Sequence, residues 1–166
     1  GSYKSNRTSV DTVSTFGYSY SVDLSTESFP VVTTKDLSGS RWDSLVYEFL
    51  WYLSGDADVS ELKQHTKIWD KWSDENDMLE TAYGRFWRQY PTAPDNQRIE
   101  GENWSTKSDR WVNDDDTVDQ LGYVVDCLEN KPHTRRMVVT AWHPANATTS
   151  LLPPCHFTLV CNVQGD

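Results

Sequence analysis

Near the end of the chain a cysteine follows two prolines and precedes a histidine, in the stretch Pro153–His156. Each proline fixes φ and supplies no backbone N–H, so the pair holds the next residue in a defined pose. Because a free thiol has a pKa of about 8.5, a nucleophilic cysteine needs positive charge nearby. Arg135 and Arg136 can supply that charge, and guanidinium groups also bind phosphate. These residues predict a nucleophilic Cys155 in a phosphate-bearing substrate site; the alternative is a structural cysteine and two surface arginines.

Glu48 is a carboxylate inside an apolar run, residues 45–53, and helical spacing places it at the edge of the apolar face. Burying an unpaired charge is costly, so such a side chain either has a partner or has its pKa raised toward the range in which it can act as a general acid or base. The alternative is a glutamate that reaches water from the flank of a helix. The sequence leaves both interpretations open.

Aromatic residues are abundant: the chain has 8 Trp, 8 Tyr and 5 Phe. Their rings bury large areas and also form flat walls on which a planar ligand can stack. The segment Ile68–Trp72 can offer such a wall, and an aromatic core patch is the alternative. Tyr83 precedes Gly84, which we expect to form a tight turn that holds the phenol.

Periodicity predicts a mixture of helices and strands without regular βαβ units, which indicates the α+β class. Apolar residues at helical spacing predict a helix that begins near Ser40 and ends at Gly55. The apolar residues with this spacing are Trp42, Leu45, Val46, Phe49 and Leu53. Residues 68–111 are aromatic, polar and irregular, which is typical of a functional region. The other predicted elements are one or two strands over 10–24, helices over 58–65 and 117–128, and strands over 137–142 and 156–163.

The excess of acidic over basic residues restricts which partners the chain can bind. It has 25 acidic and 15 basic residues and a formal charge of −10, which argues against binding to nucleic acid or to an anionic membrane. Its odd number of cysteines favours a reducing compartment, and it has no signal peptide and no apolar run that could cross a bilayer. We therefore expect a cytoplasmic protein that binds neither DNA nor a membrane.

Taken in order, these stretches resemble thymidylate synthase over nearly the whole chain. The ordered set is highly specific, although Pro-Cys-His alone is not. The resemblance implies an α+β fold with a mixed β-sheet, flanking helices and a sheet face that forms a dimer interface, and it makes residues 1–166 a single domain with part of that fold. The matching stretches are Asn6–Thr8, Phe29–Lys35, Glu48–Trp51, Ile68–Trp72, Tyr83–Arg85, Arg135–Arg136 and Pro154–His156.

The resemblance implies reductive methylation of dUMP to dTMP. The Cys155 thiolate would add to C6 of the uracil ring, and the activated C5 would attack the methylene of 5,10-methylenetetrahydrofolate. Proton removal and hydride transfer from the folate would then give dTMP and dihydrofolate, with no metal. Glu48 would manage protons around the uracil O4, Tyr83 would position the water that removes the C5 proton, and His156 would join the polar network near O4.

The binding residues follow from the same resemblance. Arg7 would hold the dUMP phosphate, and Arg135 and Arg136 would reach the phosphate in the partner subunit of a homodimer. Lys35 would lie near the glutamate tail of the folate. The residues that would line the folate rings are Ile68, Trp69, Trp72 and Leu152.

The typical family chain is considerably longer than 166 residues. It begins with another helix before Arg7 and continues past Asp166 with a further phosphate-binding arginine, an asparagine that reads the pyrimidine edge and a tail that closes the site. We therefore expect this chain to be an excerpt that is catalytically weak or inactive by itself. Its acidic surface resembles members from salt-loving organisms.

Two other functions remain open at this point. A deoxycytidylate hydroxymethylase relative is one, because the asparagine that decides between uracil and cytosine is not in these residues. The other is a non-catalytic carbohydrate-binding module, whose tryptophans would stack on sugar rings. The module leaves the spacing of the arginine pair and the Pro-Cys-His stretch unexplained.

Overall fold

A computed structural model of the chain forms two compact units, residues Gly1–Asp36 and Leu37–Asp166. The expectation of a single domain over 1–166 stays a prediction. Arg7 lies outside the described residues. The structure describes residues 1–6, 10–26, 29–91, 111, 113–115 and 117–165.

The first unit contains one short antiparallel sheet. Strands β1 (Ser2–Lys4) and β2 (Thr12–Ser14) pair so that Tyr3 lies opposite Val13. The alternating pattern over 10–24 predicted longer strands, but β2 is the only strand among the described residues of that range, and Phe16 is fully exposed. A strand needs a paired neighbour for its backbone groups, and β1 provides one for only three residues of β2.

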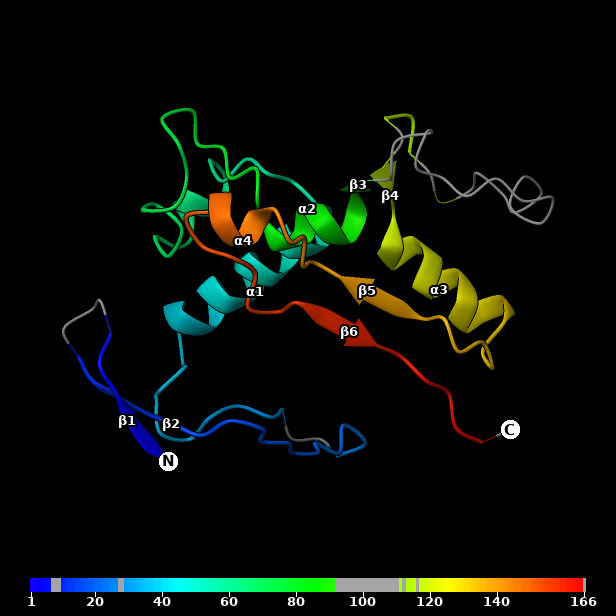
Figure 1. Ribbon diagram of the computed structural model, residues 1–166, viewed down its shortest axis with the longest axis horizontal. Coiled ribbons are helices and arrows are strands. Elements are labelled where there is room, and N and C mark those ends of the chain that lie inside the picture. The colour runs from blue at the N-terminus through cyan, green and yellow to red at the C-terminus, as the bar shows by residue number, and fades with distance from the viewer. Residues whose placement is uncertain (7–9, 27–28, 92–110, 112, 116, 166) are drawn as a thin grey trace. The chain divides into compact units, whose positions relative to one another are not determined.

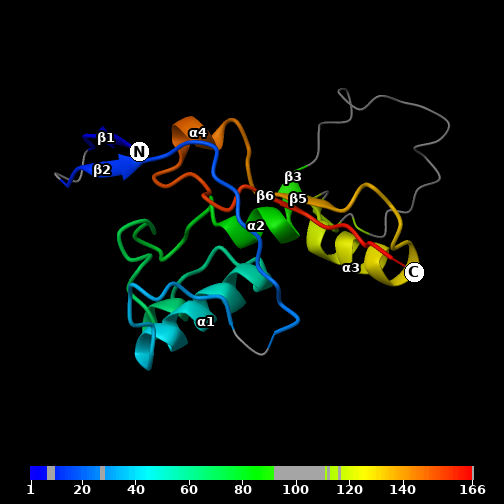
Figure 2. The same cartoon turned by 90° about the horizontal axis from the view of Figure 1, so that it is seen from below.

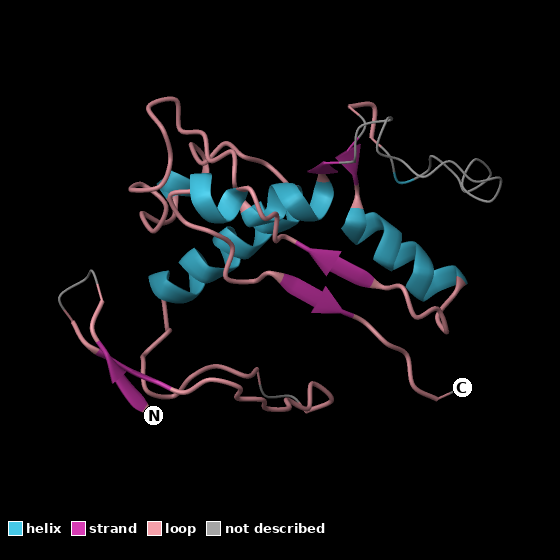
Figure 3. Ribbon diagram, viewed as in Figure 1, coloured by secondary structure: helices cyan, strands magenta, loops and turns pink. Residues whose placement is uncertain are grey.

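The second unit holds the helices and two further pairs of strands (Figure 1), and loops connect most of them (Figure 3). All the sheets in the described part of the chain are two-stranded and antiparallel, which confirms the α+β class. The predicted strands over 137–142 and 156–163 are present but shorter. The elements are α1 (Ser40–Ser54), the 3-10 helix η1 (Leu62–Gln64), α2 (Tyr83–Arg88), β3 (Tyr90–Pro91), β4 (Thr117–Val118), α3 (Gln120–Asn130), β5 (Val138–Thr140), α4 (Asn146–Thr149) and β6 (Thr158–Val160).

Helix α1 has nearly the bounds that the sequence predicts, but the face that it buries differs in part. Gly55 ends it in a left-handed conformation, φ 77°, which glycine adopts without strain. Its buried residues are Trp51 and Tyr52, whereas Phe49 is 51% exposed and Leu45 and Leu53 are also exposed. Trp42 and Val46 are partly buried, so the predicted apolar face is only partly correct. This helix carries apolar side chains around most of its circumference, and periodicity alone cannot choose among its faces.

Gly84 explains which face of α1 is buried. The sequence predicted a tight glycine turn here, but Gly84 lies in helix α2. Helix α2 itself lies between α1 and α3 in two perpendicular views (Figure 1 and Figure 2). A Cβ at Gly84 would lie 2.5 Å from the Cα of Tyr52, closer than any real packing contact. The absence of a side chain therefore lets the two helix backbones meet, and it brings Tyr52 beside Tyr83.

Helix α3 begins three residues later than the sequence predicts. Thr117 lies in β4, opposite Pro91, and the carboxylate of Asp119 caps the helix by accepting a hydrogen bond from the Gly122 backbone N–H at 2.9 Å. The inner side of α3 packs on β5 in a cluster of buried residues, Val124, Cys127, Met137 and Val139.

A larger aromatic cluster joins α1, α2 and the loop between them. Trp87 packs against both clusters and so links them. None of the helices in the described part of the chain has the length and apolar character that a membrane span needs. The buried members of the larger cluster are Trp51, Tyr52, Val59, Leu62, Trp69, Leu79, Ala82 and Tyr83.

Candidate active site

A cavity of about 290 Å³ opens where α1, α2, the loop after η1 and the loop before β6 converge, and we call it the thiol cavity. Four segments that are far apart in the sequence contribute to its wall. With the exception of Tyr52, every lining residue is one that sequence analysis had selected. The lining residues are Glu48, Tyr52, Ile68, Trp69, Trp72, Tyr83, Leu152, Cys155 and His156.

Cys155 comes to the cavity on a proline-braced loop. Pro154 is buried and anchors this loop, while the neighbouring Cys155 is exposed and unpaired by any disulfide. The fixed φ of the two prolines restrains the backbone that leads to Cys155. Cys155 is thus an accessible thiol on a restrained loop, as a nucleophile requires.

Glu48 is half-buried and has partners, so it does not simply reach into water from the flank of the helix. Its Oε1 accepts a hydrogen bond from the Tyr52 hydroxyl at 2.9 Å and another from the Trp69 indole Nε1–H at 2.7 Å. Burial and the adjacent Glu48 carboxylate both raise the pKa of Tyr52. Tyr52 is therefore a protonated donor, and the carboxylate is tied to the wall of the cavity through one oxygen.

Tyr83 joins the wall to the thiol loop. Its hydroxyl donates a 3.4 Å hydrogen bond to the Pro153 carbonyl oxygen. Burial, and then the neighbouring Cys155 thiol, raise the pKa of Tyr83 to about 12. The phenol therefore stays protonated at neutral pH, as a group that orients water or substrate should.

Two of the ring pairs around the cavity meet edge to face, which is a favourable geometry for aromatic pairs. The His156 imidazole lies 5.6 Å from the Tyr83 ring at an interplanar angle of 75°, and the Trp69 ring lies 5.6 Å from the Tyr83 ring at 88°. Trp72 and Leu152 are partly buried beside this cluster, and Ile68 is exposed at its edge. These side chains form an apolar wall beside the polar groups.

The four predicted basic residues are not part of the described cavity wall. Arg135 and Arg136 are exposed ahead of β5, and neither lines the thiol cavity. Lys35 is exposed in the first unit, and Arg7 lies outside the described residues. No Lys or Arg is among the described residues that line the cavity, so their roles stay predictions.

Tyr52 is the lining residue that sequence analysis missed. In the sequence it looks like one more member of an apolar run. Its spacing was the available signal, because residues four apart on a helix are neighbours and a phenol can reach a carboxylate one turn away. Glu48 and Tyr52 have that spacing on α1.

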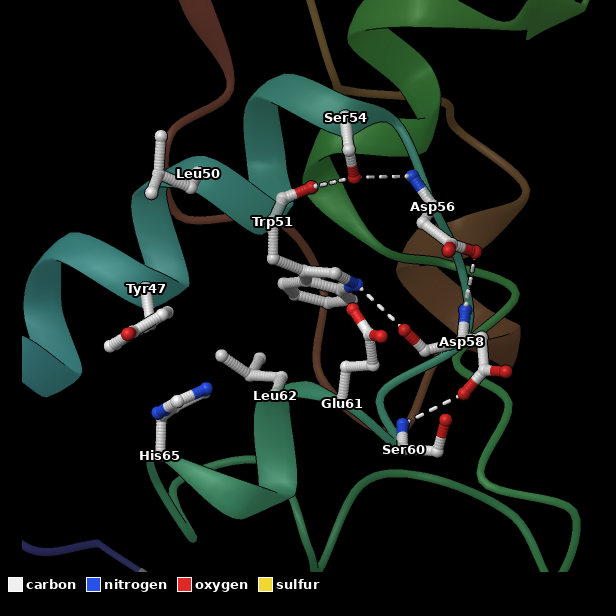
Figure 4. Close-up of a pocket in the computed structure, with 10 residues that line it drawn as sticks. All are labelled: Tyr47, Leu50, Trp51, Ser54, Asp56, Asp58, Ser60, Glu61, Leu62 and His65. Atoms are coloured by element: carbon white, nitrogen blue, oxygen red, sulfur yellow. Dashed lines mark hydrogen bonds between the residues drawn. The ribbon is translucent and has the colours of Figure 1, made fainter.

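A second cavity of about 600 Å³ lies on an adjacent face of α1 (Figure 4), and we call it the acidic cavity. Tyr47 and His65 stack there with ring centroids 3.4 Å apart. Within the described residues, no group of three or more His, Cys, Asp and Glu side chains could hold a metal ion. The lining residues are Tyr47, Leu50, Trp51, Ser54, Asp56, Asp58, Ser60, Glu61, Leu62 and His65.

The fold and the thiol cavity together define an α+β protein with an accessible thiol, a tethered carboxylate and a protonated phenol beside a wall that suits a planar ring. Comparison with known proteins gives the family. The thymidylate synthase family model matches residues 1–166. A curated thymidylate synthase of Haloferax volcanii is 55% identical over 166 residues, which are 100% of this chain and 48% of that protein. The chain belongs to the thymidylate synthase family, and it spans about half the length of this relative.

Proposed function

We propose that this chain carries the nucleophile-bearing part of a thymidylate synthase that converts dUMP to dTMP. The convergence of Cys155, Glu48, Tyr83 and His156 on one cavity is the observation that carries the proposal. The presence of Trp69 and Trp72 in the cavity wall supports contact with the ring system of a reduced folate. 5,10-Methylenetetrahydrofolate supplies the one-carbon unit and the hydride when it is bound.

Cys155 acts as the nucleophile. Its sulfur forms a bond to C6 of the uracil ring while the C5–C6 π bond gives its electrons to C5, which becomes the carbon nucleophile. C5 uses that electron pair to bond to the one-carbon unit, and loss of the C5 proton then breaks the bond between this carbon and the folate nitrogen. Hydride transfer from the folate to the same carbon restores the C5–C6 double bond and expels the thiolate, so the cysteine is regenerated. The exposed position of Cys155 on a rigid loop supports this role.

Glu48, Tyr83 and His156 handle protons and water around the ring. Glu48 is held by two donors at Oε1 and acts near the uracil O4. Tyr83 remains a hydrogen-bond donor because its pKa is raised, and it orients the water that takes the C5 proton. His156 completes the polar network beside the phenol.

The substrate phosphate and the folate tail are bound by the basic residues. Arg7 binds the phosphate within the same subunit, and Arg135 and Arg136 bind it from a partner subunit. Lys35 lies at the folate glutamate tail. Guanidinium groups suit this task because they bind phosphate with two parallel hydrogen bonds.

The protein acts as a homodimer through the outer face of β5 and β6. Val138 and Val160 lie opposite each other across this sheet and both are exposed, which supports an apolar contact there. We expect size-exclusion chromatography with light scattering to report a dimer, and Val160→Asp to shift it toward the monomer. A dimer that is unaffected by Val160→Asp contradicts this choice of face.

The protein works in the cytoplasm at high salt. The excess of 25 acidic over 15 basic residues supports this, as does the similarity to a Haloferax volcanii protein. Screening of like charges by salt would stabilise so acidic a surface. Thermal unfolding at rising KCl concentration tests it, with an increase in melting temperature expected and a decrease contradictory.

Turnover tests the central proposal. The chain and any longer protein that contains it are incubated with dUMP and 5,10-methylenetetrahydrofolate, and dTMP and dihydrofolate are measured. We expect both products from the longer protein and weak or no turnover from the 166-residue chain. A parallel reaction with dCMP distinguishes the hydroxymethylase, which would make a hydroxymethylated product without dihydrofolate. Neither product from the longer protein would overturn the proposal.

A further inference from the structure

One carboxylate oxygen in the thiol cavity accepts two hydrogen bonds from different segments. Glu48 Oε1 receives the Tyr52 hydroxyl from the same helix and the Trp69 indole N–H from the loop after η1. The other oxygen, Oε2, accepts no hydrogen bond from the described residues. A carboxylate has about four acceptor sites, and binding both donors at one oxygen fixes its rotation and leaves the second oxygen for a ligand or water.

Tyr52 is held more firmly than the glutamate that it contacts. It is only 7% exposed, and the side-chain-free Gly84 allows α2 to pack directly on its backbone. Its ring also stacks on that of Tyr83, with centroids 5.4 Å apart at an interplanar angle of 22°. The phenol therefore has little freedom, and its hydroxyl is a fixed point against which the carboxylate is aligned.

A substitution of Trp69 would not test the hydrogen bond to Glu48 alone, because Trp69 also forms part of the proposed folate wall. Tyr52 differs in that its hydroxyl contacts Glu48 while its ring is packed in the aromatic cluster. Burial and the charge on Glu48 both keep the hydroxyl protonated, so it donates rather than accepts. Removing only that oxygen atom leaves the ring packing in place.

We propose that Tyr52 is a positioning residue for Glu48: its hydroxyl holds Oε1 so that Oε2 faces the reacting ring. The inference rests on the proposed function, in which Glu48 acts on the pyrimidine. Tyr52 contacts no reacting atom in this account and acts only through the carboxylate.

Tyr52→Phe in the active, full-length protein tests the inference. We expect kcat to fall about tenfold, which corresponds to the loss of one hydrogen bond to a charged group, and the KM values for dUMP and folate to change less than about twofold. Tyr47→Phe is the matched control, because Tyr47 is on the same helix but lines the acidic cavity. It should leave kcat unchanged. A Tyr52→Phe protein with the kcat of the parent would overturn the inference.

A double-mutant cycle separates positioning from a general structural role. In a Glu48→Ala background there is no carboxylate to align, so adding Tyr52→Phe should change kcat less than about twofold. If the tenfold loss persists in that background, Tyr52 does not act through Glu48 and the inference is wrong. Thermal melts of each variant show that the proteins are folded at the assay temperature.

A crystal structure of the Tyr52→Phe protein gives an answer that does not depend on turnover. We expect the Glu48 carboxylate to rotate or to occupy more than one conformer while Trp69 and Tyr83 stay in place. An unmoved carboxylate contradicts the inference even if the enzyme is active. If instead the parent protein makes no dTMP, the proposed function fails, and the carboxylate position still decides whether Tyr52 aligns Glu48.

Discussion

The two cavities beside α1 differ in how their walls are assembled. The acidic cavity is about 600 Å³, and every residue that lines it lies between Tyr47 and His65 (Figure 4). The thiol cavity is about 290 Å³, and its wall comes from α1, residues 68–72, α2 and the loop before β6. Long-range convergence, and not volume, therefore distinguishes the thiol cavity from the acidic cavity.

The carboxylates of the two cavities are also used differently. In the acidic cavity Asp56 accepts the backbone N–H of Asp58 at 2.9 Å, and Asp58 accepts that of Ser60 at 2.7 Å. These short-range bonds shape the turn after α1, and the two bonds from Ser60 lower the pKa of Asp58. In the thiol cavity Glu48 bonds to side chains, one of them 21 residues away. The first arrangement builds a turn, and the second ties a carboxylate on α1 to a distant segment.

The largest expected effect is the loss of the thiol. Cys155→Ser should lower turnover by at least about 10³-fold, because the hydroxyl is a far weaker nucleophile, with little change in thermal stability at an exposed position. Steady-state dTMP formation measures it. Cys161→Ser is the matched control, since Cys161 packs outside the thiol cavity, and it should retain activity. Full activity in Cys155→Ser would remove the thiol cavity from the mechanism.

The same substitution in each cavity sharpens the comparison. Glu48→Gln should lower kcat about 10²-fold through loss of proton transfer, whereas Glu61→Gln in the acidic cavity should change it less than about twofold. Steady-state kinetics with both proteins at the same pH and salt decides the matter. Equal losses in the two variants would mean that overall charge, and not position in the thiol cavity, controls the rate.

Gly84→Ala tests how the thiol cavity is assembled. The new Cβ would overlap the backbone of Tyr52 and push α1 from α2, and we expect it to reduce the free energy of unfolding by about 2 kcal/mol. Arg85→Ala at the next position of α2 is the control, because it removes an exposed ion pair and a hydrogen bond, both to Glu80, and leaves the contact between α1 and α2 in place. Urea denaturation of both variants measures the difference. A stable Gly84→Ala protein would show that the helices need not touch.

The smallest expected effect concerns alkaline pH. The pKa of Tyr83 is raised to about 12, above the value of about 10 for an unfolded phenol. Between those values the folded state keeps a proton that the unfolded state has lost. The contribution of the Tyr83 phenol to the free energy of unfolding is therefore complete below about pH 10 and disappears toward pH 12. In Tyr83→Phe the free energy of unfolding should therefore fall less steeply over that window. Parallel slopes in urea denaturation would contradict the raised pKa.

The sequence predicted which residues line the thiol cavity better than it predicted the packing that forms it. The ordered resemblance to the family selected Cys155, Glu48 and Tyr83, and that pattern needs no knowledge of distant contacts. The buried face of α1 was predicted only in part, since apolar residues surround most of that helix and periodicity does not reveal the contact between Tyr52 and Gly84. That contact is long-range, which explains why Tyr52 was missed as a lining residue.

Element bounds show the same limit. Helix α1 was predicted almost to the residue because Gly55 is a local end signal, whereas α3 begins late because Thr117 pairs with Pro91 instead of entering the helix. Strands were predicted too long wherever their length depends on a pairing partner. Three predicted roles stay predictions, because they concern contacts with ligands or with a second subunit and not contacts within one chain. They are the roles of Lys35, Arg135 and Arg136.

The most direct test of the account is the site of covalent attachment. The active protein is incubated with 5-fluoro-dUMP and 5,10-methylenetetrahydrofolate, and its intact mass and peptide masses are then measured. We predict a mass increase equal to both molecules together, located on the peptide that contains Cys155 and missing in Cys155→Ser. Absence of an adduct in a protein that makes dTMP, or an adduct on Cys161 instead, would contradict the assignment of Cys155 as the nucleophile.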